Sequence, residues 1–139
     1  MHLWHLTPDA SRLPLRVSRG ERVAIEVGTW PIEPGQSVSI LFHVEHAGHS
    51  SAIGCIGAVW QRNESGNSYW RAEIGPFVSE DRVSYTVRGR SPEGAVEGPT
   101  GTFLVGPKLY LAILWHQHQP IYKDTESSTA RGSYLHPWV

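Results

Sequence analysis

Between residues 11 and 106, apolar residues alternate with polar ones in short runs that are separated by turn residues. A period of two is typical of strands with one buried face, because successive side chains of a strand point to opposite sides. The alternate apolar positions are Leu13, Leu15 and Val17; Val23, Ile25 and Val27; Val38, Ile40, Phe42 and Val44; Trp70, Ala72 and Ile74; and Val83, Tyr85 and Val87. Turn clusters such as Pro34-Gly35 and Ser91-Pro92-Glu93-Gly94 lie between runs.

About six to eight short strands at this spacing favour a mainly β fold, an immunoglobulin-like β-sandwich. We assign residues 1–106 to this accessory domain. Hydrophobic residues make up 40% of the 139-residue chain, and a chain of this size buries roughly two-thirds of its surface on folding, so it supplies its own core. The apolar stretch 52–60 contains Gly54 and Gly57, and its pattern leaves the buried face open.

The pattern changes at Gly106-Pro107. Residues 109–115 are continuously apolar, which is typical of a strand buried on both faces in a parallel α/β sheet. A His-rich turn and a polar loop follow, but neither a crossover helix nor a second parallel strand follows before Val139. We therefore predict that residues 107–139 are the truncated start of an α/β domain.

The charge balance and the cysteine content limit which classes of partner the chain can bind and indicate its cellular compartment. Lys and Arg number 12 against 13 Asp and Glu, without a basic stripe, which argues against a nucleic-acid partner. The single cysteine, Cys55, rules out an intrachain disulfide and indicates a reducing, cytoplasmic location, where we expect it as a small core residue. The first residues lack a basic signal-peptide region, and the longest apolar run has seven residues, whereas a spanning helix needs about 20. We therefore expect no membrane partner.

His116 and His118 stand just beyond the end of the predicted apolar strand. Residues two apart in an extended segment project to the same side, so both imidazoles can face one pocket. Active sites of parallel α/β folds lie at this edge of the sheet. Three interpretations remain open: hydrogen bonds to loop carbonyls, a metal pair with His136 as a further ligand, and contact with a substrate.

The run over residues 111–120, which ends in His116-Gln117-His118-Gln119-Pro120, closely resembles the opening of family 57 glycoside hydrolases. Tyr122-Lys123-Asp124 continues this likeness, and the terminal Pro137-Trp138-Val139 is similar to the family's next block. The resemblance covers residues 108–139. His136 departs from it, because an apolar residue is expected before Pro137.

This resemblance implies the start of a (β/α)7 barrel that acts on α-glucans by a retaining mechanism, as an α-amylase-like hydrolase or a glucanotransferase. Its nucleophile and acid/base carboxylates, about 5–5.5 Å apart, would lie downstream. Asp124 and Glu126 are expected to be solvated loop charges, so the fragment itself should be inactive, with no cofactor and no metal. The resemblance makes His118 a sugar contact, with His116 and Gln119 shaping the same pocket.

The chain contains six tryptophans. Indoles stack on the apolar faces of sugar rings, so an exposed tryptophan on a β-sandwich suggests carbohydrate binding. Trp70 is in phase with Ala72 and Ile74 and is expected in the core, whereas Trp30 and Trp60 are the candidates for sugar contact. The stretches 69–77 and 81–87 look like the N-terminal immunoglobulin-like domains of several glucan-acting enzymes.

The leading hypothesis is the N-terminal fragment of a glucan-acting glycoside hydrolase, whose partners are an α-glucan or another oligosaccharide and the missing barrel. Two alternatives remain: a stand-alone β-sandwich carbohydrate-binding module, and a metal-dependent hydrolase using His116 and His118.

Overall fold

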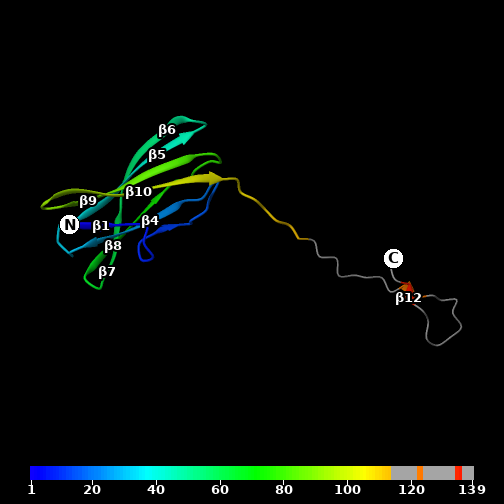
Figure 1. The fold of residues 1–139 in the computed structure, drawn as a ribbon, viewed down its shortest axis with the longest axis horizontal. Coiled ribbons are helices and arrows are strands. Elements are labelled where there is room, and N and C mark those ends of the chain that lie inside the picture. Colours follow the sequence, from blue (N-terminus) through cyan, green and yellow to red (C-terminus); the bar gives the residue numbers. More distant parts are fainter. Residues whose placement is uncertain (114–121, 124–133, 136–139) are drawn as a thin grey trace. The chain divides into compact units, whose positions relative to one another are not determined.

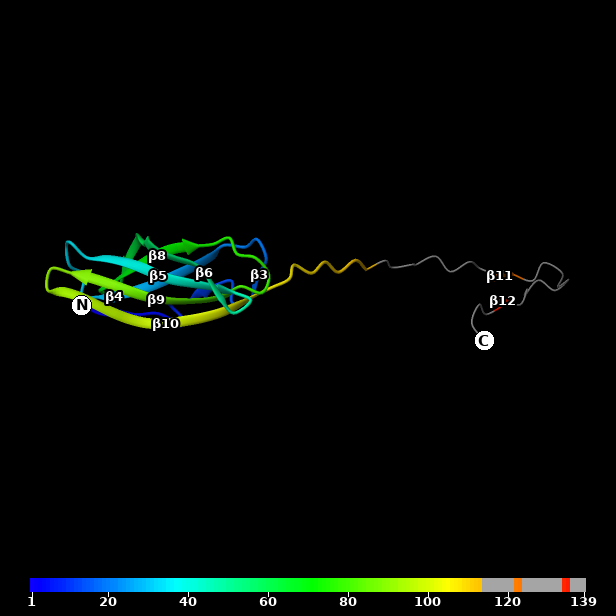
Figure 2. The same cartoon turned by 90° about the horizontal axis from the view of Figure 1, so that it is seen from above.

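The computed structural model describes residues 1–113, 122–123 and 134–135. The chain divides into two units, Met1–Lys108 and Leu109–Val139. The first unit is a sandwich of two β-sheets (Figure 1; Figure 2). The described residues contain no helix, and therefore no helix long and apolar enough to cross a membrane.

The first sheet has the strand order β1-β4-β8-β7, with β2 also paired to β4. Its strands are β1 (His2–Trp4), β2 (Arg12–Leu13), β4 (Val23–Trp30), β7 (Val59–Glu64) and β8 (Asn67–Ile74). The second sheet has the order β3-β10-β9-β5-β6. Its strands are β3 (Val17–Ser18), β5 (Ser37–His46), β6 (His49–Gly57), β9 (Arg82–Ser91) and β10 (Gly94–Gly106). In the second unit, β11 (Tyr122–Lys123) pairs with β12 (Tyr134–Leu135).

The core lies between the sheets and is built from the alternating residues of the central strands. Val23, Ile25 and Val27 of β4 are fully buried, as are Val83 and Val87 of β9. Register brings inward-facing residues together, since Ile25 lies opposite Ala72 and Ile40 opposite Val87. Trp70 packs against this core, as predicted, and its Nε1 donates to Thr29 Oγ1 at 3.0 Å. The prediction of a mainly β, sandwich-like fold is confirmed for the first unit.

The predicted strand through Leu13, Leu15 and Val17 is wrong. β2 pairs with β4 of the first sheet, whereas β3 pairs in parallel with β10 of the second sheet, and the chain crosses between them at residues 14–16. Pro14 lacks the backbone N–H that a continuing ladder needs. Leu13 and Leu15 are consequently exposed, and only Val17 reaches the core.

The stretch 52–60 has no single buried face because it belongs to two edges. β6 is the edge strand of the second sheet and β7 the edge strand of the first. The chain passes between them at Ala58, whose N–H donates to the Val38 carbonyl at 2.8 Å. Cys55 lies opposite Leu41 on the side of β6 that faces away from the core, so it is exposed, contrary to the expectation of a core residue.

The predicted strand over residues 109–115 is described only over 109–113. These residues form no strand, and Leu109, Leu111 and Ile113 are exposed. A strand needs a hydrogen-bonded neighbour, and no described strand pairs with this segment. The strand prediction is therefore wrong for residues 109–113, and the truncated barrel remains a prediction.

Candidate functional site

The predicted site residues fall into two groups. His116, His118 and Gln119 lie outside the described residues, as do the loop carboxylates Asp124 and Glu126 and the metal-ligand candidate His136. Trp30 and Trp60 belong to the first unit and are both exposed, at 56% and 51% of their surface.

Trp30 and Trp60 lie on opposite faces of the first sheet. Trp60 is paired in register with Trp70, which in turn lies opposite the buried Val27, so Trp60 is on the core side of the edge strand β7. Trp30 follows the fully buried Thr29 in β4 and therefore points away from the core. The structure does not bring the two predicted tryptophans into one site.

Trp30 shares the outer face of the first sheet with two aromatic rings from β1. His2 lies opposite Trp30, and Trp4 lies opposite Gly28. Residues directly opposed in an antiparallel pair project to the same face and lie close together. The ring planes of His2 and Trp4 are within 26° of each other, with centroids 5.7 Å apart. We call the surface formed by His2, Trp4, Asp9, Trp30, Arg62 and Tyr69 the outer aromatic face.

Trp4 is held in place on three sides. Its indole lies on Gly28, where a β-carbon would overlap the ring. Its Nε1 donates to Asp9 Oδ2 at 3.2 Å. The Tyr69 ring meets it edge-on, at 88° and 6.2 Å between centroids. The Trp4 ring is thus fixed in orientation while remaining partly open to solvent.

Asp9 joins the two rings. Tyr69, which is buried, donates its hydroxyl to the same Asp9 Oδ2 at 2.9 Å. The nearby hydroxyl of Thr7, the hydroxyl of Tyr69 and the Trp4 indole all lower the pKa of Asp9. Tyr69 and Trp4 do so through direct hydrogen bonds, whereas the buried Thr7 hydroxyl makes no hydrogen bond of its own. The bond to Asp9 in turn raises the pKa of Tyr69. Asp9 is therefore a charged acceptor at neutral pH.

Arg62 completes the outer aromatic face. Its guanidinium carbon lies 4.3 Å from the centre of the Tyr69 ring, a cation–π arrangement. Its Nε also donates to Glu64 Oε2 at 3.1 Å. Roughly half of the Arg62 side chain stays exposed, so its remaining N–H groups are open to a ligand.

The buried side chain of His5 has a structural role. Its Nδ1 lies 2.7 Å from the Glu26 carbonyl and its Nε2 lies 2.9 Å from the Tyr85 hydroxyl. Because a carbonyl can only accept, Nδ1 carries the proton and Nε2 accepts from Tyr85. Burial lowers the pKa of His5, which keeps the ring neutral. At 4% exposure the ring is closed to substrates.

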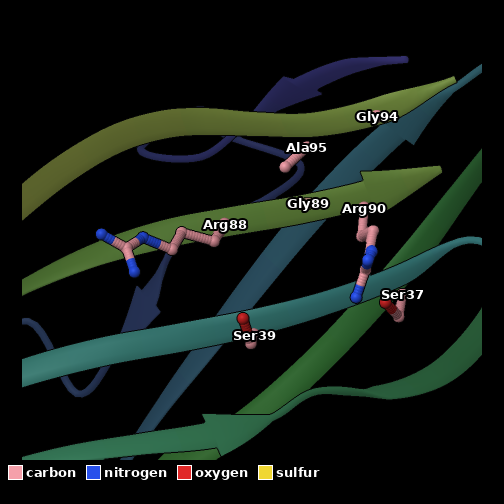
Figure 3. A pocket seen from close by; sticks show the side chains of 7 residues that line it. All are labelled: Ser37, Ser39, Arg88, Gly89, Arg90, Gly94 and Ala95. Atoms are coloured by element: carbon pink, nitrogen blue, oxygen red, sulfur yellow. The ribbon is translucent and has the colours of Figure 1, made fainter.

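Two hollows occur elsewhere on the first unit. One, of about 420 Å³, lies on the outer side of the second sheet and is lined by Ser37, Ser39, Arg88, Gly89, Arg90, Gly94 and Ala95. In it, Arg90 reaches toward Ser37, while Arg88 points away from Ser37 (Figure 3). The Arg88 guanidinium pairs with Glu97 at 3.6 Å. The other, of about 540 Å³, lies where β10 ends. Neither is lined by an aromatic side chain, so neither offers a surface for ring stacking. The described residues hold no group of three or more potential metal ligands.

The chain is similar to a small part of two larger enzymes. Over 117 residues the chain is 30% identical to the isomaltosyltransferase of Sporosarcina globispora. The aligned region covers 84% of this chain and 10% of that enzyme. It superposes with a TM-score of 0.66 and 30% identity on the cycloalternan-forming enzyme of Listeria monocytogenes, solved with a pentasaccharide substrate, over 76% of this chain and 10% of that one. The homologues are therefore enzymes of the carbohydrate-active class.

Part of the chain is also similar to a described domain family. Residues 7–70 match the family described as Lmo2446-like, N-terminal. The Listeria monocytogenes protein lmo2446, solved in complex with α- and β-D-glucose, magnesium and calcium, also superposes with a TM-score of 0.66, 30% identity and the same shares of the two chains. The chain spans about a tenth of the length of these relatives.

Sequence reasoning missed the arrangement of Trp4, Asp9 and Tyr69. The available signal was His2 and Trp4 two residues apart, which in a strand share a face. Asp9 follows the strand, and Tyr69 lies 60 residues further along the chain, so only the strand register reveals their contact.

Proposed function

We propose that this chain is the N-terminal part of an α-glucan-acting glycoside hydrolase or glucanotransferase. Its β domain would be an immunoglobulin-like accessory domain that binds the glucan for the catalytic part. The observation that carries this proposal is the alignment of 84% of the chain with an isomaltosyltransferase. A relative that holds a pentasaccharide substrate supports an oligosaccharide as the ligand.

The catalytic part would begin within residues 107–139. Their resemblance to family 57 supports the start of a (β/α)7 barrel, with the nucleophile and acid/base carboxylates further along the protein. His118 would then hydrogen-bond the sugar at the cleavage site, and His116 and Gln119 would shape the pocket. Because both carboxylates would be absent, the 139-residue chain alone should release no sugar.

The β domain would contact the glucan through an exposed tryptophan, and the two candidates from the sequence, Trp30 and Trp60, each expose about half of their side chain. Indole rings provide the flat apolar surface that sugar C–H groups stack on.

Two measurements test this function. The first is release of reducing sugar from starch or amylose by the purified chain, where we expect none; turnover that survives repurification would contradict the proposal. The second is the coding sequence beyond Val139, where we expect further barrel strands followed by a carboxylate in two places.

A stand-alone carbohydrate-binding module is the alternative, and the coding sequence separates it from the enzyme fragment. A stop codon directly after Val139 would favour the stand-alone module. Retarded migration of the chain in an amylopectin gel is expected for both.

A further inference from the structure

We propose that the outer aromatic face is the sugar-binding site of the β domain and that Trp60 does not belong to it. The assignment of an α-glucan as the ligand rests on the proposed function. The location of the site rests on the geometry of the first sheet alone.

Trp30 supplies the exposed stacking ring. More than half of its side chain is open to solvent, and within the described part of the chain its indole nitrogen makes no hydrogen bond. A large apolar ring that neither packs into the core nor bonds to its neighbours adds little to folding. Its donor and its flat face are therefore free for a ligand with both C–H and hydroxyl groups.

Trp4 supplies a second ring that is already ordered. The Gly28 floor, the Asp9 acceptor and the Tyr69 edge leave it a single orientation. A rigid platform loses little conformational entropy when a sugar binds, which favours affinity. With His2 beside both Trp4 and Trp30, the three rings form an aromatic strip across β1 and β4.

Polar groups beside the strip can bind sugar hydroxyls. Both hydrogen bonds that Asp9 accepts from Tyr69 and Trp4 fall on Oδ2, which leaves Oδ1 as an acceptor for a ligand hydroxyl. The exposed N–H groups of Arg62 are donors on the far side of Tyr69. Small-ligand sites typically combine apolar or aromatic side chains with a few fixed polar groups, and the outer aromatic face has this composition.

Trp60 lacks these neighbours. It lies on the other face of the sheet, and its Nε1 is already bonded to Asn63 Oδ1 at 3.0 Å. Its exposure is nearly the same as that of Trp30, 51% against 56%, so the two tryptophans form a matched pair for mutation.

The test compares Trp30→Ala with Trp60→Ala in the purified chain. Binding is measured by affinity electrophoresis in amylopectin and by calorimetry with maltoheptaose and with an α-1,6-linked isomalto-oligosaccharide. We expect Trp30→Ala to weaken binding of the preferred probe about tenfold or more, as for a central aromatic contact, while Trp60→Ala binds as the parent does. Asp9→Asn should weaken it also, with denaturant unfolding showing that each variant is folded.

The outcomes separate this site from the function on which it rests. If Trp60→Ala loses binding and Trp30→Ala retains it, the outer aromatic face is refuted while glucan binding stands. If both variants retain parental affinity, the location is again refuted. If the parent chain binds none of the probes, glucan binding itself is refuted, and the proposed function of the β domain fails with it.

Discussion

Replacing Gly28 by Ala should displace Trp4 from its place on β4. Gly28 lies in a regular strand conformation, so the added methyl group causes no backbone strain. Its β-carbon would, however, occupy the space of the Trp4 indole, and the ring must lift away. The free energy of unfolding should therefore fall by the contribution of the contacts that hold Trp4.

The magnitude follows from those contacts. A hydrogen bond to a charged group contributes about 1.5–3 kcal/mol, and the lower end applies here because Asp9 is exposed. The edge-on contact with Tyr69 adds about 0.5–1.5 kcal/mol. The alanine reduces the entropy of the unfolded chain and returns about 0.4–1 kcal/mol. Gly28→Ala should therefore destabilise the β domain by about 2 kcal/mol.

Urea unfolding followed by circular dichroism measures this difference, and tryptophan fluorescence reports the displaced ring. Gly57→Ala is the matched control, because a β-carbon at Gly57 meets nothing within 4 Å. We expect Gly57→Ala to leave the free energy of unfolding within about 1 kcal/mol of the parent. A Gly28→Ala domain as stable as the Gly57→Ala domain would refute the packing of Trp4 on Gly28.

The remaining predictions concern the buried histidine His5, the core and His118 of the proposed barrel segment. Since folding lowers the pKa of His5 from its ordinary value of 6.5, the unfolded chain binds the extra proton, and the free energy of unfolding should fall as pH drops below 6.5. Urea titrations at about pH 5 and about pH 7.5 measure this, and Tyr85→Phe should cost about 1–3 kcal/mol at the higher pH by leaving His5 Nε2 unpaired. Ile40→Val, in the fully buried core, should cost about 0.5–1.5 kcal/mol, whereas Ile53→Val at 73% exposure should cost almost nothing; equal losses would contradict the assignment of the core. In a longer protein that contains the catalytic part, His118→Ala should lower kcat by about 10²–10³ with an almost unchanged thermal midpoint, and near-normal kcat would exclude a role in the chemical step.

The burial of the central strands was predictable from the sequence, because it is a local property. A strand such as β4 presents Val23, Ile25 and Val27 to one side whatever its neighbours are, and that side must be buried. The residues alone therefore determined the central strands β4, β5, β8 and β9, their inward faces and a mainly β fold.

Where the chain changes sheets was not predictable from alternation. Leu13 and Leu15 have the same pattern as Val23 and Ile25, yet they are exposed. Around Pro14 the chain passes from β2, which pairs with β4, to β3, which pairs with β10 of the other sheet. The same holds for residues 52–60, which run along one sheet edge and then the other. Alternation records which residues share a face, but the pairing partner decides whether that face is covered.

The candidate site divides in the same way. Composition and spacing singled out Trp30 and Trp60 as exposed candidates, and both are exposed. Only tertiary structure separated them onto opposite faces and gathered Trp4, Asp9 and Tyr69 around one of those faces. Their contacts depend on the register of β1 and β8 on β4, which is set by the packing of both sheets and which no single segment of the sequence contains.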